Sequence, residues 1–425
     1  MKARKSGRAW LRDKDAEKSK ASFPELFFDL VFVFGLIQLS HTLAEDFTSA
    51  TAGEALLLIL AIWWLWINTT WVTNLLNTDS EPVRLLLFAL MFAGILLAIA
   101  LPEAFGDHPL PFAVIYVGMQ IGRSLFAWFA FRRHDPKSAS TFLRITVWAC
   151  AAGTLWIGGG LASFEWRLSI WSIALGLEYS APLLRFRFPG LGGSEKETLH
   201  LNGEHLAERC ALFVIICLGE TILTTGRNAA EHMGTDLTFL VFCGAFLTTV
   251  AMWWIYFHQG QEEAAEKAEV TSKPEAVAHN LFTYGHLPIV AGIILTAVGE
   301  DFALSHPHEQ ADLRATAAIA GGPFLFLCGN IWLKLAAAER IPFSHAAGLV
   351  GLLAIAIATP LLPLYGITSP PRRHCSPQAL GSMLRFAGHL RNRHKNRLAL
   401  RNTRAMSKEI RGVRAEAAIA CPRAW

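Results

Sequence analysis

Charged residues are scarce in this sequence. Asp, Glu, Lys and Arg make up 17% of its 425 residues, whereas they make up about 25% of a typical soluble domain. Hydrophobic residues reach 53% of the chain, and they gather in blocks of about 20 residues, the length that crosses a bilayer. This shortage of charge excludes an ordinary soluble protein and indicates a chain that crosses a membrane.

Motifs of soluble enzymes and of metal or disulfide proteins are also lacking. No P-loop, dinucleotide fingerprint or G-x-S-x-G sequence occurs, so we assign no catalytic residue, expect no cofactor and favour a non-enzyme. The seven cysteines include no C-x-x-C pair, which argues against a disulfide framework and a cysteine zinc site. His200, Glu204 and His205 lack the H-E-x-x-H order, and we expect no metal. The basic charge alone would allow binding to nucleic acid, but no fold that binds nucleic acid supports it, so we expect no nucleic-acid partner.

The apolar blocks are predicted to be about eleven membrane-spanning helices. They are too long and too uniformly apolar for barrel strands, which alternate over about 10 residues. Helices also satisfy their own backbone groups in lipid. The predicted fold is therefore an all-α, polytopic transmembrane helical bundle. The spans lie near residues 24–44, 54–75, 83–101, 111–131, 141–160, 166–185, 205–226, 236–258, 279–299, 314–336 and 345–366.

Basic residues alternate between the loops. The segment 1–23 holds eight Lys and Arg residues but no apolar core or small-residue cleavage site. It is therefore predicted to be a basic arm before a retained first span, not a cleaved signal peptide. Every second loop after this arm is richer in Lys and Arg than the loops between, and such loops stay in the cytoplasm. The alternation predicts a cytoplasmic N-terminus.

The C-terminal region does not fit this alternation. Residues 371–425 hold 13 Lys and Arg residues and two acidic residues, a net charge of 13 − 2 = +11. After eleven spans, this region would lie on the non-cytoplasmic side, against the rule. Either one span is miscounted, or a twelfth is missing, or the tail departs from the rule. A frame change in the coding sequence or a native cytoplasmic extension would each explain such a tail.

Four spans in the second half of the chain resemble four in the first half, in the same order. They predict a tandem repeat of six-helix units, and an even number of helices makes such a repeat parallel. The second unit is incomplete, because Pro370-Pro371-Arg372-Arg373 cannot span a membrane. The matches are Trp63-Trp64-Leu65-Trp66 with Trp253-Trp254-Ile255-Tyr256, Ala93–Leu97 with Ala291–Leu295, Gly118 and Trp128 with Gly322 and Trp332, and the helix starts at Glu25 and Glu208. The predicted parts are a basic cytoplasmic arm (1–23), a first repeat (24–190), a cytoplasmic linker (191–204), a second repeat (205–366) and a disordered basic tail (367–425).

Ionisable residues inside the spans are the best pointers to function, because charge is costly in hydrocarbon. Glu25 ends a Ser-x-x-Glu capping box, and Asp29 lies one turn deeper on the same face. His205, Arg209 and Glu220 fall within about 60° on a helical wheel. Glu220 is 15 residues beyond His205, roughly 22 Å along the axis. A buried Glu–Arg pair that locks helices together and a direct role in a conduction or proton path both stay open.

Arg123 lies close to the midpoint of the fourth span, directly after Gly118-x-x-x-Gly122. The two small residues predict close helix packing. A charged group at this depth needs an acidic partner, and the candidates are Glu178, Glu220 and Asp29. Together these residues predict a polar intramembrane path or a set of ion pairs.

Two segments resemble signatures of the bacterial low temperature requirement protein A family. The first is Glu25-Leu26-Phe27-Phe28-Asp29-Leu30-Val31-Phe32-Val33-Phe34, running to Gln38-Leu39-Ser40-His41; the second is His205-x-x-Glu208-Arg209 followed by Leu218-Gly219-Glu220-Thr221-Ile222. The resemblance covers about residues 20–366 and implies a bacterial inner-membrane protein required for growth in the cold. It carries Glu25, Asp29, His205, Glu208, Arg209 and Glu220 over as signature residues without assigned chemistry.

Three classes of function compete. The leading hypothesis is transport or conduction of a small ion or solute through a path that uses Glu220 and Arg123. The second is a membrane-embedded enzyme or lipid-homeostasis factor, which predicts that Glu25, Asp29, His205 and Glu208 converge in one pocket. The third is a scaffold whose buried charges only hold helices together. The expected partners are membrane lipids and an unidentified small ion or solute, and an oligomer is compatible with the sequence.

Overall fold

In a computed structural model, the chain is a bundle of helices. The structure describes residues 10–12, 20–193, 201–232, 236–258, 274–305, 313–337 and 343–358. These ranges contain no sheet strand, only two isolated β-bridges. The prediction of an all-α bundle is confirmed. Most of residues 1–23, part of the linker 191–204 and the whole tail 367–425 lie outside the described residues.

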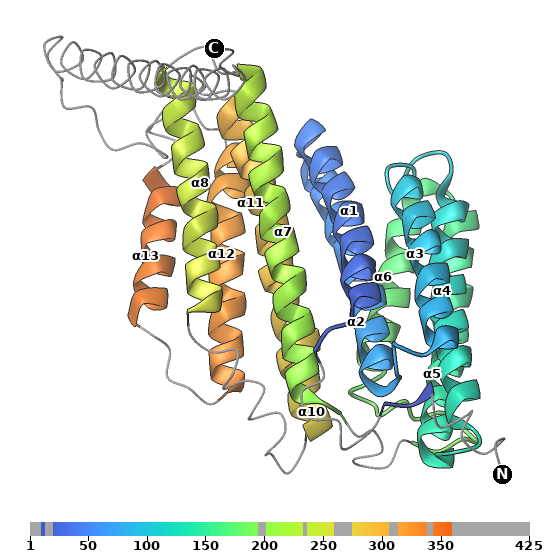
Figure 1. The fold of residues 1–425 in the computed structure, drawn as a ribbon. Coiled ribbons are helices and arrows are strands. Elements are labelled where there is room, and N and C mark those ends of the chain that lie inside the picture. Colours follow the sequence, from blue (N-terminus) through green and yellow to red (C-terminus); the bar gives the residue numbers. More distant parts are fainter. Residues whose placement is uncertain are drawn as a thin grey trace, which may run out of the picture. The chain divides into compact units, whose positions relative to one another are not determined.

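Eleven helical segments are described, one for each predicted span (Figure 1). One of them is composite, since a short α-helix, a π-helix and a long α-helix follow one another without a break. The bounds are α1 Phe23–Glu45, α2 Ser49–Leu75, α3 Glu81–Ala100, α4 Pro109–Phe131, α5 Pro136–Leu161, α6 Phe164–Ser180, α7 Gly203–His232, α8 Asp236–Phe257, α10 Pro274–Ala278, η2 His279–Gly285, α11 His286–Ser305, α12 Leu313–Ala336 and α13 Phe343–Ala358.

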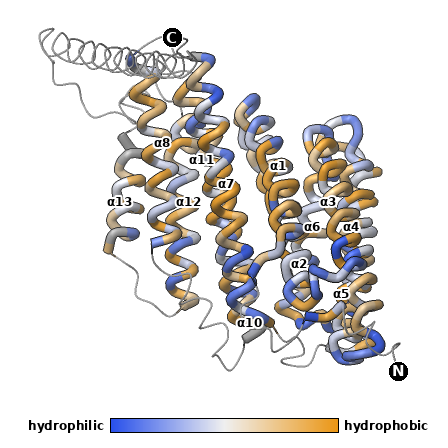
Figure 2. Tube along the Cα trace, viewed as in Figure 1, coloured by the Kyte–Doolittle hydropathy of each residue, from blue (hydrophilic) through white to orange (hydrophobic). Residues whose placement is uncertain are grey.

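Eight of the described helices are long and apolar enough to cross a membrane. Figure 2 shows hydrophobic residues along the middle of the helices and hydrophilic residues mainly toward their ends and in the loops. Of the other predicted spans, α6 has 17 residues and α13 has 16, while α7 has 30 residues with acidic groups near both ends. The chain is a multi-pass membrane protein.

The same pattern of helix pairs occurs in both halves of the chain. In the first half α1 packs on α2 and α3, α3 packs on α4, and α4 packs on α5. In the second half α7 packs on α8 and α11, α11 packs on α12, and α12 packs on α13. The residues that match in sequence have unlike surroundings, however, because Trp63 and Trp64 are buried while Trp253 and Trp254 are exposed. The repeat stays a prediction.

Close helix packing occurs at glycines other than those expected. A Cβ atom on Gly118 or Gly122 would meet nothing within 4 Å, so the prediction of a tight contact there is wrong. Both glycines lie on the exposed face of α4. The tight contact lies between α11 and α12, where a Cβ atom on Gly292 would come within 2.5 Å of the backbone nitrogen of Phe326.

A π-helix interrupts the most buried span. Thr283 of η2 is held by two tryptophans of α2, since Trp63 Nε1 donates to its carbonyl at 2.7 Å and Trp71 Nε1 donates to its hydroxyl at 3.1 Å. His279 stacks on Trp71 with ring centroids 4.0 Å apart. This segment therefore ties the two halves of the chain together in the core.

Candidate functional site

The two signature segments meet where α1 and α7 begin. Arg209 Nη1 lies 2.8 Å from Glu25 Oε1, and Arg209 contacts both carboxylate oxygens of Asp29, at 2.5 and 3.2 Å. His205 Nε2 lies 3.2 Å from Glu25 Oε1. We call Glu25, Asp29, His205 and Arg209 the ion cluster. Glu25 and Asp29 lie one helical turn apart on α1, as His205 and Arg209 do on α7. This spacing lets all four side chains meet in one contact.

The ion cluster is closed to its surroundings. All four residues are 0% exposed. Burying ions costs several kcal/mol each unless every group is paired and hydrogen-bonded. The cluster therefore depends on neutral donors from neighbouring residues.

Neutral donors complete the cluster from α1 and α2. The amide and hydroxyl of Ser22 both donate to Glu25 Oε2 at 2.9 Å, which confirms that Glu25 caps its helix. Trp66 Nε1 donates to Asp29 Oδ1 at 2.7 Å. Asn74 Nδ2 lies 3.1 Å from His205 Nδ1 and donates to the carbonyl of Asn202 at 2.8 Å. The start of α7 is thus fixed to α1 and to the end of α2.

The basic arm also contacts the cluster. Arg12 Nη2 lies 3.2 Å from His205 Nε2 and donates to the carbonyl of Thr73 at 3.1 Å. Burial lowers the pKa of Arg12 from its usual value, and the Glu25 carboxylate opposes this shift. Leu11 forms an isolated bridge with Leu76. Arg12 is therefore anchored beside the ion cluster, and Leu11 is anchored at the end of α2.

Glu208 is adjacent to the cluster but outside it. Its Oε2 atom accepts the amide hydrogen of Ala21 at 3.0 Å, just before α1 begins. The second functional hypothesis predicts that Glu208 converges with Glu25, Asp29 and His205 in one pocket. Glu208 links the same two helix starts, but its side chain is not part of the ion cluster.

A second polar group lies between α2, α4 and α6. Arg123 Nη1 donates to the carbonyl of Leu65 at 3.1 Å and to Thr69 Oγ1 at 3.2 Å, and Nη2 donates to Gln120 Oε1. Tyr116 accepts from Gln120 at 3.2 Å and donates to Glu178 Oε2 at 2.7 Å. Among the described side chains, Arg123 and Glu178 are linked through these two neutral groups and form no direct ion pair. Glu178 is thus the only one of the three candidate acids in this group, since Asp29 pairs with Arg209 and Glu220 lies elsewhere.

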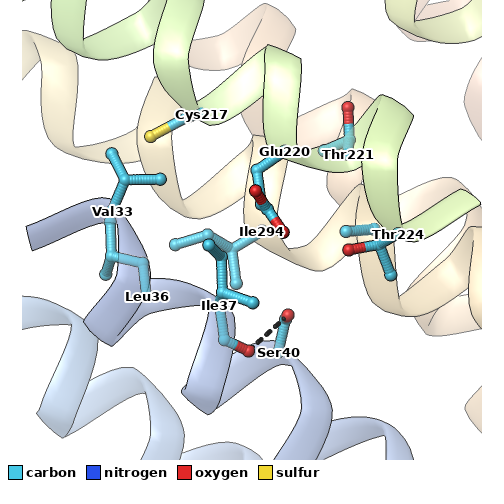
Figure 3. Close-up of a pocket in the computed structure, with 10 residues that line it drawn as sticks. Val33, Leu36, Ile37, Ser40, Cys217, Glu220, Thr221, Thr224 and Ile294 are labelled. Carbon is cyan, nitrogen blue, oxygen red and sulfur yellow. Dashed lines mark hydrogen bonds between the residues drawn. The ribbon is translucent and has the colours of Figure 1, made fainter. Parts of the chain in front are cut away.

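Glu220 lies in a pocket between α1, α7 and α11 (Figure 3). Its half-buried side chain extends from α7 into the space that α1 and α11 also border. The pocket is small, with a cavity volume of ≈ 20 Å³, and it is partly open to the surroundings. It is lined by Val33, Leu36, Ile37, Ser40, Cys217, Glu220, Thr221, Thr224, Ile294 and Ala297. We call it the Glu220 pocket.

The Glu220 pocket and the ion cluster are separate along α7. The side chains between them on this helix include Cys210, Phe213, Val214 and Cys217, all of them buried and apolar in character. Beyond the pocket, Arg227 Nη2 lies 3.1 Å from His41 Nε2 and links α7 to α1 once more. The contacts with Glu25 at one end and His41 at the other show that α1 and α7 run in the same direction.

Sequence reasoning missed an acidic pair at the end of α11. Glu300 accepts a hydrogen bond from Thr225 Oγ1 at 2.6 Å, and Asp301 accepts one from Asn228. The predicted span ended at residue 299, but the helix continues to Ser305. An apolar run that resumes after Glu300-Asp301 is the signal that could have placed both residues inside the helix.

The arrangement offers two kinds of chemistry. The ion cluster has its charges paired and closed in, which suits it to hold α1 and α7 together. The Glu220 pocket has a largely apolar wall, into which the carboxylate of Glu220 extends, while the hydroxyl groups of Ser40 and Thr221 donate to carbonyls of their own helices. The described residues contain no group of three or more His, Cys, Asp and Glu side chains that could hold a metal ion, and His200 lies outside them.

Comparison with known proteins agrees with the resemblance of the two signature segments. The family model of the bacterial low temperature requirement A protein (LtrA) matches residues 20–370. The chain is 56% identical over 358 residues to Uncharacterized protein RA0937 of Rhizobium meliloti (strain 1021), an alignment that covers 84% of this chain and 88% of that protein. No solved structure matches. The chain therefore belongs to the bacterial low temperature requirement A protein family.

Proposed function

We propose that the protein moves a small cation across the bacterial inner membrane, with its N-terminus in the cytoplasm. The observation that carries this proposal is the Glu220 pocket. A carboxylate that is only half buried, well inside the 30-residue helix α7, costs free energy that structural packing alone does not require. Ionisable groups kept in membrane spans commonly mark ion or proton pathways.

The position of Glu220 along α7 supports this proposal. Glu220 lies 15 residues beyond His205, roughly 22 Å along the helix axis. Ile222 and Leu223, two and three residues after Glu220, are 42% and 66% exposed. Large exposed apolar side chains so close to Glu220 on the helix suit contact with lipid, which supports a position of Glu220 at hydrocarbon depth.

The chemistry of the pocket favours a cation. Among the ten lining residues Glu220 is the one charged side chain. Thr224 forms a hydrogen bond with its carboxylate, and the basic groups that act on it, His41 and Arg227, lie outside the lining. Carboxylate and hydroxyl oxygens suit hard cations and protons. The charges of the ion cluster pair with one another, and Arg123 donates to neutral groups. The proposal therefore assigns both to helix packing and uses Glu220 alone.

The directions of α1 and α7 also support the proposal. α1 and α7 run in parallel, as a parallel repeat of six-helix units requires, and this is a plan that transporters use. The proposal places the starts of both helices, with the ion cluster, toward the cytoplasm, because the basic arm precedes α1.

Flux through purified protein in liposomes tests the proposal. Wild-type protein should carry at least one of H⁺, Na⁺ and K⁺ faster than protein-free liposomes, and Glu220→Gln should remove this flux. Glu231→Gln is the matched control, because Glu231 lies on the same helix but is exposed. Wild-type flux equal to that of empty liposomes for all three ions would contradict the proposal.

A lipid-modifying role is the alternative that one observation favours. Glu25, Asp29 and His205 do converge, as that hypothesis requires. The cluster is fully buried, however, and an enzyme would need to open it to a lipid headgroup. A lipid profile that changes on deletion of the gene, at low and normal temperature, would favour this alternative. If the protein is only a scaffold, Glu220→Gln should lower its stability and should not alter any flux.

A further inference from the structure

Glu300 is a carboxyl group with too few partners for its burial. Its side chain is 7% exposed, near the end of α11. Oε2 accepts one hydrogen bond, from Thr225 Oγ1 at 2.6 Å. Oε1 is buried and has no hydrogen-bond partner among the described residues. This differs from Glu25 and Asp29, which are also buried but contact Arg209.

The surroundings of Glu300 are mostly apolar. Its neighbours on α11, Ala303 and Leu304, pack with Ala229 of α7 and Val241 of α8 in one buried cluster. One residue before it, Gly299 is pressed against the backbone of α12. Water and lipid are thus largely kept away from the carboxyl group.

The charged groups on the helices around Glu300 have other partners or are exposed. Within the described residues, Asp301 accepts from Asn228, and Arg227 contacts His41 of α1. Glu231 of α7, Asp236 of α8 and Arg314 of α12 are exposed. Glu220 lies in its own pocket. No basic side chain in this part of the chain forms an ion pair with Glu300.

A carboxylate in this position would be a poorly compensated charge. A single neutral hydrogen bond offsets only a small part of the cost of removing an ionised carboxylate from water, and such groups become neutral by taking up a proton. A bond from Thr225 to one oxygen is compatible with this neutral form, in which the other oxygen carries the proton.

The Glu220 pocket leads toward Glu300. Thr224 and Ala297 both line the pocket, and Thr225 follows Thr224 directly on α7. Ala297 precedes Glu300 by three residues, which puts them on neighbouring turns of one face of α11. The pocket and the Thr225–Glu300 hydrogen bond therefore lie along the same seam between α7 and α11.

We infer that Glu300 is a proton-binding site and that the cation moved through the Glu220 pocket is the proton. This inference rests on the proposed function for the identity of the transported ion, but the binding of a proton by Glu300 does not depend on it. Thr225 is a positioning residue, which holds the carboxyl group through its hydroxyl.

Infrared spectroscopy of the full chain in lipid membranes tests the binding site. At neutral pH the spectrum of the wild type minus that of Glu300→Gln should contain a carbonyl stretching band of a protonated carboxyl group, a difference that leaves out any band from Glu178, which is also buried. Glu231→Gln, whose carboxyl group is exposed, should keep the band. Thr225→Val should keep the band but shift it to higher frequency, because the hydrogen bond to the carbonyl is lost. A difference spectrum without this band, or no shift in Thr225→Val if Glu300→Gln does not fold, would overturn the site.

Proton flux into liposomes, followed with an enclosed pH-sensitive dye, tests the transported ion. The wild type should carry protons, and Glu300→Gln should reduce the flux to that of protein-free liposomes. If the band is lost in Glu300→Gln but the wild type carries Na⁺ or K⁺ and no protons, the assignment of the ion is overturned and transport stands. If it carries no cation at all, the proposed function fails while the proton site remains.

Discussion

At the scale of single residues, Arg209 is the centre of the contact between α1 and α7. One guanidinium group contacts the carboxylates of both Glu25 and Asp29. Its planar fork of donors suits two acidic partners better than the single ammonium of a lysine does. The burial of all three side chains means that none of them can turn to water if the others are lost.

Replacing Arg209 should therefore destabilise the protein strongly. Arg209→Gln leaves two carboxylates buried without a cation, and breaking a buried pair in this way costs about 3–5 kcal/mol. Thermal unfolding in detergent, followed by tryptophan fluorescence, should show a large fall in Tm. Arg133→Gln removes an exposed arginine and serves as the control.

Asp29→Asn should partly restore stability to the Arg209→Gln variant, because it removes one of the uncompensated charges. An equal fall in Tm for Arg209→Gln and Arg133→Gln would show that the ion cluster does not hold the helices together.

Some of this site could be read from the sequence and some could not. The capping role of Glu25 follows from local spacing, and the shared helix face of His205, Arg209 and Glu220 follows from helical periodicity. All three side chains do contact α1 or the pocket beside it. Which acid pairs with Arg209 depends on how two distant helices pack, and no local pattern carries that information. Glu300 escapes a sequence-based prediction because the charged pair Glu300-Asp301 resembles the end of a span.

At the scale of elements, the closest helix contact lies between α11 and α12. Backbone atoms of the two helices meet at Gly292, Gly299 and Gly322, where a Cβ atom would come too close to the opposite backbone. In membranes, small residues allow such approach, and packing replaces the hydrophobic effect as the driving force. Gly118 of α4, which matches Gly322 in sequence, has no such contact.

Alanine substitutions at Gly322 and at Gly118 should distinguish the close backbone contact from the open position. Gly322→Ala forces the backbones of α11 and α12 apart, and overpacking of this kind costs about 1–3 kcal/mol. Gly118→Ala meets nothing within 4 Å and should cause no loss. Tm values in detergent check the difference, and equal effects of the two substitutions would speak against the close contact.

At the scale of the whole molecule, composition was enough to predict the fold class. Blocks of apolar residues correspond to each described helix, because the thickness of the bilayer sets their length. The parallel repeat could not be established in the same way. Its helix pairs recur in both halves, yet Gly118 and Gly322 have different surroundings, and the residues that would complete the second unit lie outside the described part.

Orientation is the property of the whole molecule that labelling can check. Asp107 and Arg133 lie in exposed loops at the two ends of α4, so they should be on opposite sides of the membrane. With a cytoplasmic N-terminus, Asp107→Cys should react with a membrane-impermeant maleimide in intact cells. Arg133→Cys should react only after the cells are opened. The wild type measures the background from native cysteines, and the reverse pattern would invert the topology.

The π-helix η2 determines the rotation of everything that follows it on α11. Each residue of an α-helix turns the next by about 100°, so the wider turn of a π-helix changes the direction in which all later side chains point. Thr283 is held in this conformation by Trp63 and Trp71 of α2. The phase of α11, and with it the side on which Glu300 and the glycines lie, is thus set some fifteen residues earlier by two indole rings from the other half of the chain.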